Sequence, residues 1–312
     1  MSNDNNRPAD VDLSIIIVNW NTSRELRLCL TSLASTDAIS KEVIVVDNAS
    51  SDDSVAMVRS EFPCVKCIAH NANSGFAKGC NLGIAESKGR YVLLLNPDCE
   101  AQPGAMEALV RFGDANKEAG IFGLKVLNSD GTIQHSCRHA PTFGAVLFRN
   151  AALNKLFPNN PYTREYLLTS WNHDSVIEID WVSGAALVMR RELIDDIGTL
   201  DERFYMYCED MDLGYRAKQH GWKVIYFPDA IVTHAKGRSS DKDPNRMIIE
   251  HHKSMYRYFM KHQAGSSSVF MRAIVPAGLM FRAGMLITAN AFRHIAWVIR
   301  HRGTASKRSN SG

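Results

Sequence analysis

Residues 91–98 have the sequence Tyr-Val-Leu-Leu-Leu-Asn-Pro-Asp and carry the clearest indication of the fold class. The first five are apolar, which is typical of a strand buried on both faces of a parallel sheet. Pro97 ends the strand and stiffens the turn after it. Asp98 therefore follows a buried strand directly, at the edge where open α/β sheets bind ligands.

Strands and helices alternate on both sides of this stretch. The strands are predicted at Leu13–Val18, Glu42–Asp47, Val65–Ala69, Tyr91–Leu95 and Ile121–Val126. The helices are predicted at Thr22–Leu33, Asp52–Glu61, Ser74–Ser87 and Gly104–Glu118. Such alternation indicates an α/β fold with a mostly parallel central sheet, right-handed crossovers and flanking helices.

The second half of the chain has a weaker pattern. Residues 128–166 mix aromatic residues and prolines without clear periodicity, and we expect a long excursion beside the ligand-binding edge. Further strands are predicted at Ile177–Trp181, Ala185–Met189, Val224–Phe227 and Ile231–His234. Further helices are predicted at Arg191–Ile197, Glu209–His220 and Asn245–His262.

Polar residues follow the predicted strands of the first half. Asn19 follows the first strand and Asp47 ends the second, where a carboxylate can accept a hydrogen bond from a base or a ribose hydroxyl. Residues 73–76, Asn-Ser-Gly-Phe, open a helix whose amides and dipole can face a phosphate. The chain has no GxGxxG after the first strand and no GxxxxGK(S/T) motif, which argues against a dinucleotide cofactor and a P-loop.

A second acidic signature lies at residues 207–213, Tyr-Cys-Glu-Asp-Met-Asp-Leu. It places Glu209, Asp210 and Asp212 at the start of a predicted helix, where the helix dipole is expected to lower the pKa of a carboxyl group. One of these acids can take a proton, while Asp98 can hold a metal. The alternative is that the acids only cap the helix, and their spacing alone does not decide between the two.

The last part of the chain is basic and apolar. After Glu250 there is no acidic residue, so the first 250 residues are net acidic although the whole chain carries +3. The basic residues after this point are Lys253, Arg257, Lys261, Arg272, Arg282, Arg293, Arg300, Arg302, Lys307 and Arg308. The uncharged stretches between them reach only about ten residues, which predicts a segment too short to span a bilayer.

The arginines of this segment share one side of a predicted helix. Arg282, Arg293 and Arg300 lie close together on a helical wheel, and Pro276 is expected to separate Arg272 from that helix. An apolar surface with a basic stripe is typical of a helix in an anionic membrane interface, here through residues 265–312. The alternatives are packing on the rest of the chain and a homodimer contact. No recognition motif accompanies the charge, so no nucleic-acid partner is expected.

The cysteines and the N-terminus favour a cytoplasmic location. The seven cysteines lack the spacing of a disulfide framework. Residues 1–12 are polar, lack the apolar core of a signal peptide and are expected to be a disordered tail.

Several motifs occur in an order that resembles an inverting family 2 glycosyltransferase of the GT-A fold, in its bacterial rhamnosyltransferase-like branch. They are Ser14-Ile-Ile-Ile-Val-Asn-Trp-Asn21, Val46-Asp-Asn-Ala-Ser50, Asn73-Ser-Gly-Phe76, Asn96-Pro-Asp98 and Glu209-Asp210. The resemblance covers about residues 12–240. It implies a nucleotide-diphospho-sugar donor, a divalent metal (Mg or Mn) and a product with inverted anomeric configuration.

The resemblance also implies roles for single residues. Asp210 would be the catalytic base, and Glu209 would orient it or bind the acceptor. Asp98 and His234 would hold the metal, with one carboxylate fewer than in many relatives because Asn96 replaces an aspartate. The donor-binding residues would be Asn19, Asp47 (on the pyrimidine), Asn73, Gly75, Phe76, Asn96, Gly184, Lys236 and Arg238.

These observations predict a catalytic domain at residues 13–240, with a nucleotide-sugar half at 13–127 and an acceptor half at 128–240. Residues 241–312 would form a helical, amphipathic, basic segment. The predicted activity moves a sugar, with L-rhamnose as the leading candidate, to a hydroxyl of a glycan or polyprenyl-linked acceptor. It would serve polysaccharide or cell-wall biosynthesis at the inner face of the plasma membrane. The alternatives are a sugar nucleotidyltransferase and a non-catalytic, membrane-associated protein that binds nucleotide sugars.

Overall fold

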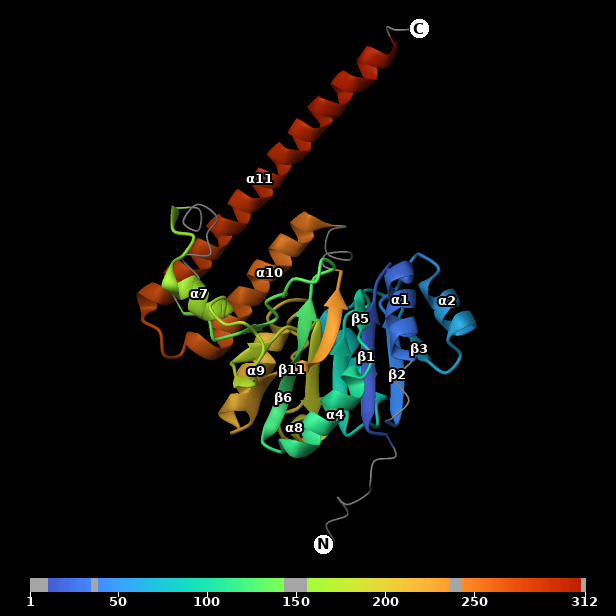
Figure 1. The fold of residues 1–312 in the computed structure, drawn as a ribbon. Coiled ribbons are helices and arrows are strands. Elements are labelled where there is room, and N and C mark those ends of the chain that lie inside the picture. The colour runs from blue at the N-terminus through green and yellow to red at the C-terminus, as the bar shows by residue number, and fades with distance from the viewer. Residues whose placement is uncertain (1–10, 35–38, 143–155, 236–242, 310–312) are drawn as a thin grey trace. The chain divides into compact units, whose positions relative to one another are not determined.

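A computed structural model describes residues 11–34, 39–142, 156–235 and 243–309 (Figure 1). The chain divides into two compact units. We call residues 1–205 and 209–239 the sheet unit, and residues 206–208 and 240–312 the helical unit. The expected disordered tail lies almost wholly outside the described residues.

The first half of the sheet unit has the expected parallel topology. Its strands are β1 (Leu13–Asn19), β2 (Lys41–Asp47), β3 (Lys66–Ala69) and β4 (Tyr91–Leu95), in the spatial order β3-β2-β1-β4. All three neighbouring pairs are parallel. Helices α1 (Ser23–Ala34), α2 (Ser54–Glu61) and α3 (Phe76–Ala85) connect them, and α4 (Ala105–Ala115) follows β4. The predicted α/β fold is confirmed.

The second half of the sheet departs from the simple alternation. β10 (Ala186–Arg190) lies between β4 and β6 (Ala119–Leu127) and is antiparallel to both. Beyond β6 come β11 (Lys223–His234) and then the short β5 (Cys99–Ala101). The two short strands predicted within 224–234 are one strand, with a register shift between Phe227 and Ile231. β8 (Ile177–Glu178) also pairs with β11.

Two hydrophobic clusters cover the two faces of the sheet. Alternate residues of β1 belong to different clusters, for example Ile15 to one and Ile16 to the other. The first cluster includes buried residues of α1, α2 and α4. The second includes buried residues of α3, α8 (Arg191–Ile197) and α9 (Glu209–Gln219). Helices thus cover both faces of the sheet, and the polar residues Asn19 and Asp47 end two neighbouring strands at one edge.

Residues 128–166 are described only in part, because 143–155 lie outside the described residues. Within this excursion, β7 (Cys137–Arg138) pairs with β9 (Trp181–Val182) as a small second sheet. Helix α7 (Pro161–Leu167) follows, capped by the side chain of Asn160. The excursion therefore contributes the segment 134–138 to the edge of the sheet unit.

The helical unit contains α10 (Pro244–Tyr258), the π-helical turn η2 (Phe259–Gln263) and α11 (Val269–Ser309). The expected break at Pro276 is wrong, because α11 runs through it. A proline inside a helix costs roughly 3 kcal/mol, and α11 continues for more than thirty residues beyond it. The expectation that the segment is too short to span a bilayer is also wrong. Val269–Arg293 is long and apolar enough to cross one, because the interrupting arginines do not end the helix.

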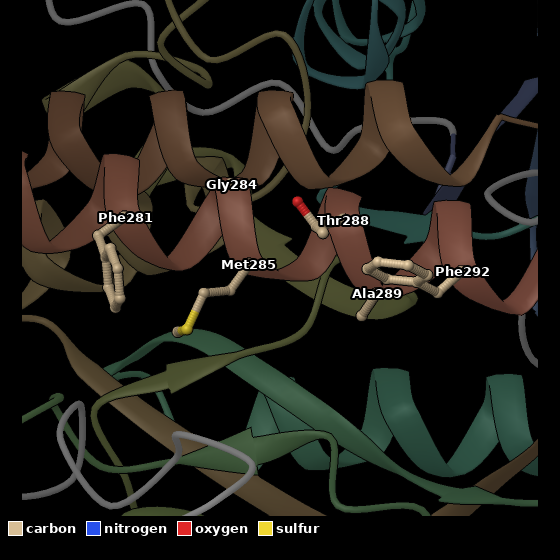
Figure 2. Close-up of a pocket in the computed structure, with 6 residues that line it drawn as sticks. All are labelled: Phe281, Gly284, Met285, Thr288, Ala289 and Phe292. Atoms are coloured by element: carbon tan, nitrogen blue, oxygen red, sulfur yellow. The ribbon is translucent and has the colours of Figure 1, made fainter.

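One side of α11 presents exposed aromatic residues. Phe270, Phe281 and Phe292 are 70%, 68% and 67% exposed. They recur every eleven residues, close to three full helical turns, so they share one face. Figure 2 shows Phe281 and Phe292 on α11 with Met285 between them, around an open hollow whose floor has the small residues Gly284, Thr288 and Ala289.

Candidate active site

The ends of β1 and β2 are joined by a buried polar network. Asn19 Nδ2 donates to Asp47 Oδ1 at 2.9 Å, and the Ser50 amide and hydroxyl both donate to the Asp47 carboxylate. Thr22 donates its hydroxyl proton to Asn19 Oδ1. Asp47 is 2% exposed. Its carboxylate stabilises the turn at Ser50 by accepting these two hydrogen bonds. Contact of Asn19 and Asp47 with a donor stays a prediction.

The amides at the start of α3 are bonded within the protein. Phe76 N donates to Tyr205 O at 2.7 Å, and Gly75 N donates to Asn73 Oδ1 at 3.1 Å. Gly75 has φ +92, and a Cβ there would lie 2.3 Å from Tyr205 O, so only glycine fits. Asn73 also accepts from the Tyr205 hydroxyl. The phosphate contact expected of this turn stays a prediction.

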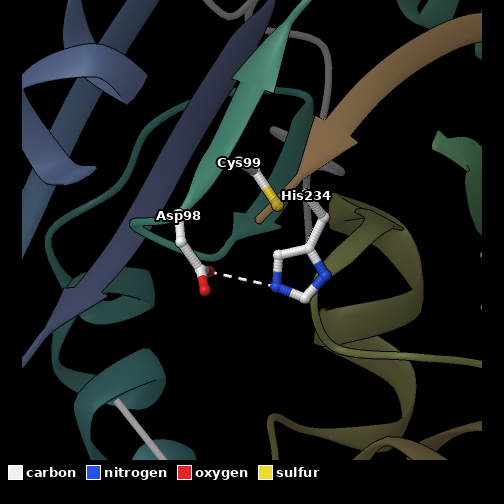
Figure 3. A group of neighbouring side chains, drawn as sticks. All are labelled: Asp98, Cys99 and His234. Atoms are coloured by element: carbon white, nitrogen blue, oxygen red, sulfur yellow. Dashed lines mark ion pairs between the residues drawn. The ribbon is translucent and has the colours of Figure 1, made fainter. Parts of the chain in front are cut away.

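Asp98 and His234 meet across the sheet edge (Figure 3). Asp98 follows β4, and His234 ends β11, where it pairs in register with Cys99. Asp98 Oδ1 lies 3.0 Å from His234 Nε2, and both side chains are largely buried. Gln134 Oε1 lies 2.7 Å from His234 Nδ1 on the other side of the ring. Asn96 Nδ2 lies 3.4 Å from His234 Nε2.

This geometry fits a divalent cation. When His234 Nδ1 donates to Gln134, the neutral ring has its lone pair on Nε2, facing the Asp98 carboxylate. Two acceptors 3.0 Å apart are compatible only when a proton or a cation lies between them. Neighbouring ligands of an octahedral Mg²⁺, at bond lengths of about 2.1 Å, lie about 3 Å apart. The pair can therefore provide two ligands, and it can equally exist as an imidazolium–carboxylate ion pair.

Cys99 lies within the same group of candidate ligands but is a poor one. Its Sγ lies 3.5 Å from Ala185 O, to which the thiol donates. Burial, and next the nearby Asp98 carboxylate, hold the pKa of Cys99 well above its usual range. A neutral thiol does not suit a hard cation, which prefers oxygen and imidazole ligands.

Glu209 and Asp210 open α9, as predicted. Asp210 accepts the amide protons of Gly184 at 3.0 Å and Met211 at 2.8 Å, so its carboxylate has a fixed orientation. Burial raises the pKa of Asp210, which overturns the expected lowering by the helix dipole because desolvation outweighs the amide donors. The pKa of Glu209 is raised further, by burial and then by Asp210. Glu209 is 4% exposed and its Oε2 has no hydrogen-bond partner.

Phe76 and Gly184 come together beside these acids. A Cβ on Gly184 would lie 2.9 Å from the Phe76 ring and 3.8 Å from Glu209 Oε1. Because Gly184 has no side chain, the Phe76 ring can pack against its backbone. The amide of Gly184 donates to Asp210 at the same place. Direct contact of Phe76 or Gly184 with a donor stays a prediction. Lys236 and Arg238 lie outside the described residues.

Two further residues escaped the sequence reasoning. Gln134 and Arg138 belong to the excursion 128–166, where no periodicity or spacing marks them. Gln134 orients His234, and the Arg138 guanidinium interacts electrostatically with Asp210. The pairing of β7 with β9 and the bond from Gln134 N to Val126 O bring this segment to the sheet edge, and a local alternation of residue types in the sequence does not reveal such long-range contacts.

The sheet unit combines a carboxylate–imidazole pair at one strand end with a carboxylate at the start of a later helix, an arrangement compatible with a glycosyltransferase. The chain belongs to glycosyl transferase family 2, whose sequence pattern matches residues 14–196. A second pattern, glycosyl transferase family group 2, matches residues 145–302. Membership favours glycosyl transfer over the nucleotidyltransferase and binding-protein alternatives.

Known proteins agree with this assignment. The chain is 29% identical, over 90% of its length and 94% of the relative, to an N-acetylglucosaminyl-diphospho-decaprenol L-rhamnosyltransferase of Mycobacterium tuberculosis. A mannosyltransferase of Pyrobaculum calidifontis, solved with GDP-Man and Mn²⁺, matches with a TM-score of 0.54 and 16% identity over 96% of this chain and 84% of that one. S. aureus TarS 1-349 with UDP-GlcNAc matches with a TM-score of 0.53 and 16% identity, over 87% and 72%. The two structures support the fold.

Proposed function

We propose that this protein is an inverting glycosyltransferase that moves L-rhamnose from a nucleotide-diphosphate donor to a hydroxyl of a polyprenyl-diphosphate-linked N-acetylglucosamine. The observation that carries the mechanism is the presence, in one unit, of the Asp98–His234 pair and of the oriented Asp210 carboxylate. The sugar and the acceptor are taken from the mycobacterial relative, which matches along nearly its whole length.

The donor side of the proposed site faces a leaving diphosphate. Asp98 and His234 would hold a divalent cation, Mg²⁺ or Mn²⁺, whose charge stabilises the departing diphosphate. Gln134 fixes the ring of His234 through Nδ1 and so keeps Nε2 directed at Asp98. Asn96 contributes an amide near Nε2, and Lys236 and Arg238 are proposed as further cationic partners of the diphosphate.

The acceptor side requires a base. Asp210 would take the proton of the acceptor hydroxyl while that oxygen attacks the anomeric carbon opposite the leaving diphosphate, which inverts the configuration. The Gly184 and Met211 amides keep its carboxylate in place. Its raised pKa makes it a stronger base than a solvated aspartate once it is ionised. Glu209, whose pKa is raised further, would remain protonated and limit the negative charge beside Asp210.

The chain would divide this work along its length. Residues 13–127 would bind the nucleotide sugar, and residues 128–240 would bind the acceptor. The exposed phenylalanines of α11 and the basic residues of 265–312 would hold the enzyme at the cytoplasmic face of an anionic membrane, where a polyprenyl acceptor resides. A homodimer formed through the same face of α11 is the alternative for this helix.

A donor and acceptor screen tests the proposal. Purified full-length protein is incubated with a short-chain polyprenyl-diphospho-GlcNAc, Mg²⁺ or Mn²⁺, and nucleotide sugars in turn, and products are identified by mass spectrometry. We expect a deoxyhexose increment with a nucleotide-diphospho-rhamnose donor and loss of product with EDTA. Transfer of a different sugar would correct the donor, and absence of product with every donor would overturn the activity.

A further inference from the structure

Arg138 lies on the acceptor side of the site and has an unusual environment. It ends β7, where it pairs in register with Trp181 of β9. Its guanidinium carbon lies 4.9 Å from the centre of the Trp181 ring and 5.9 Å from that of Tyr166. Both rings belong to buried side chains, so they restrict how the half-buried guanidinium can turn.

The described residues use little of the hydrogen-bonding capacity of Arg138. A guanidinium carries five N–H donors. In the described part of the chain, Arg138 makes one side-chain hydrogen bond, from Nη2 to His135 O at 3.2 Å. Its Nε is buried and has no hydrogen-bond partner, and none of the ion pairs among the described residues includes it. Buried polar groups are rarely left in this state, so a ligand acceptor would complete the hydrogen bonds that the described residues leave open.

The location of Arg138 identifies the kind of ligand. Next to Arg138 on the same strand pair, the Ser183 amide donates to Ser136 O at 2.7 Å, and the following amide, of Gly184, donates to Asp210 at 3.0 Å. A ligand bound by Arg138 would therefore lie on the side of the site that holds the proposed base. A planar, oriented guanidinium suits bidentate contact with phosphate oxygens. The Asp98–His234 pair belongs to the leaving diphosphate of the donor, so Arg138 is free to serve a second anion.

We propose that Arg138 binds the diphosphate of a lipid-linked acceptor and selects that acceptor over an uncharged glycoside. The inference rests on the proposed function for the class of acceptor. It makes Arg138 a residue that determines specificity, because its bonds are made to a part of the acceptor that does not react.

The test compares two acceptors with wild-type enzyme and Arg138→Gln. One acceptor is a short-chain isoprenyl-diphospho-GlcNAc, and the other is an O-alkyl GlcNAc glycoside of similar length. We expect the variant to raise KM for the diphosphate acceptor by about 10- to 100-fold, the range for loss of charge-assisted hydrogen bonds. KM for the uncharged glycoside should change by less than about 3-fold. Arg138→Lys should recover part of the lost affinity, because lysine keeps the positive charge but lacks the planar guanidinium that makes two hydrogen bonds at once.

Other outcomes would overturn the assignment. An equal KM increase for both acceptors would make Arg138 a structural support of β7. An unchanged KM with a shifted acid limb of the pH–rate profile would make it a residue that tunes Asp210. Arg164→Gln, which removes an equal charge from the exposed face of α7, is the matched control and should behave as wild type.

A binding measurement separates this inference from the proposed reaction. Calorimetry with the same two acceptors requires no turnover. The wild-type protein should bind the diphosphate acceptor more tightly, and Arg138→Gln should lose that preference. If this holds while no donor gives product, the proposed activity fails and the Arg138 assignment stands. Equal affinities of the wild-type protein for the two acceptors would refute the assignment itself.

Discussion

Glu209 and Asp210 are neighbours in the sequence but have different surroundings. Asp210 has two amide donors, whereas Glu209 is buried with one carboxylate oxygen unpartnered. Ionising two neighbouring buried carboxyl groups at once is unfavourable in free energy, because the two negative charges repel each other and both are desolvated. Burial raises the pKa of both carboxyls, and only Asp210 has amide donors to stabilise a negative charge, so this arrangement favours ionisation of Asp210, the proposed base, before Glu209.

Asp210→Asn should abolish most transfer and keep donor binding. The side chain keeps its shape, but it can no longer accept a proton. We expect kcat to fall by about 10²-fold or more, the scale of general-base catalysis, with donor affinity within a factor of about 2. Steady-state kinetics and calorimetry with the donor measure the two quantities. Loss of donor affinity with kcat unchanged would identify Asp210 as a binding residue.

Glu209→Gln should change how stability depends on pH. Because the folded-state pKa of Glu209 is raised, the folded chain binds the proton more tightly than the unfolded chain. Its contribution to stability is therefore full below the unfolded-state pKa and is lost as pH rises through the raised pKa. Glutamine has no such loss, so the variant should become the more stable protein at high pH. Urea unfolding from about pH 5 to about pH 9 measures this difference. Parallel curves for the two proteins would show that Glu209 does not titrate here.

Asp98→Ala should remove metal-supported turnover without unfolding the protein. Asp98 lies in a turn, and its removal opens no core cavity. We expect the activity with Mg²⁺ or Mn²⁺ to fall by about 10²-fold or more, because the leaving diphosphate loses its cation. Circular dichroism should show a folded protein with one cooperative melting transition, at a somewhat lower temperature because His234 loses its buried partner. Near-normal turnover would refute the role of Asp98 in binding the metal.

At the residue scale, the sequence could predict the acids and not their partners. Asp98, His234 and Asp210 follow strands or open a helix, and such positions are visible in a linear pattern. Gln134 and Arg138 act through contacts with residues far away in the chain, which no local pattern encodes. The pKa of Asp210 was predicted in the wrong direction because burial, unlike the helix dipole, depends on tertiary packing.

At the scale of elements, the first half of the sheet was predictable and the second was not. β1 to β4 follow one another in sequence and pair as βαβ units. The alternation of strand and helix patterns along the chain is therefore sufficient to predict this half of the sheet. β10 lies between β4 and β6, although the residues that it pairs with are about 65 residues or more away in the sequence. No local sequence pattern indicates that its direction is antiparallel. β5 has only three residues and directly follows the Asp98 turn.

Arg190 illustrates how β10 joins the elements around it. Its buried guanidinium donates to the carbonyls of Gly113 and Asn116 at the end of α4, to Ala119 O of β6 and to the Tyr91 hydroxyl of β4. The cation thus satisfies carbonyls that α4 leaves unpaired at its negative end.

Arg190→Met should destabilise the protein by about 2–4 kcal/mol, because several buried carbonyls lose a charged donor. Guanidinium unfolding followed by circular dichroism measures the change. Arg111→Met, at an exposed position of α4, is the matched control and should stay within about 0.5 kcal/mol of wild type. Because no hydrogen bond of Arg190 involves Glu209 or Asp210, kcat of the folded variant should be close to wild type. A stability equal to that of the control would contradict this account.

At the scale of the whole molecule, charge and composition separate the two units. Both hydrophobic clusters consist of residues of the sheet unit, and neither includes a residue of the part of 265–293 whose side chains are described. The helical unit holds α11, which has a column of exposed phenylalanines and no acidic residue. The sequence predicted this division of composition but not the length of α11, because arginines and a proline within a helix were treated as breaks.

Truncation after residue 264 should leave a folded protein that binds the donor. It keeps both core clusters and the residues proposed to face the donor, Asp47, Asp98 and His234. It should lose binding to anionic liposomes and transfer to long-chain lipid acceptors, and keep transfer to short soluble ones. Flotation with liposomes and assays on both acceptors measure these effects.

The full-length protein allows the membrane mode to be resolved by the same flotation assay. High salt should weaken its liposome binding only in part, because salt screens the arginines but not the insertion of Phe270, Phe281 and Phe292. Extraction at alkaline pH releases a helix that lies in the interface and retains one that spans the bilayer, as Val269–Arg293 is long enough to do. If the truncated protein unfolds and the full-length protein ignores liposomes, α11 is a packing or dimerisation element, and analytical ultracentrifugation should then find a dimer through its phenylalanine face.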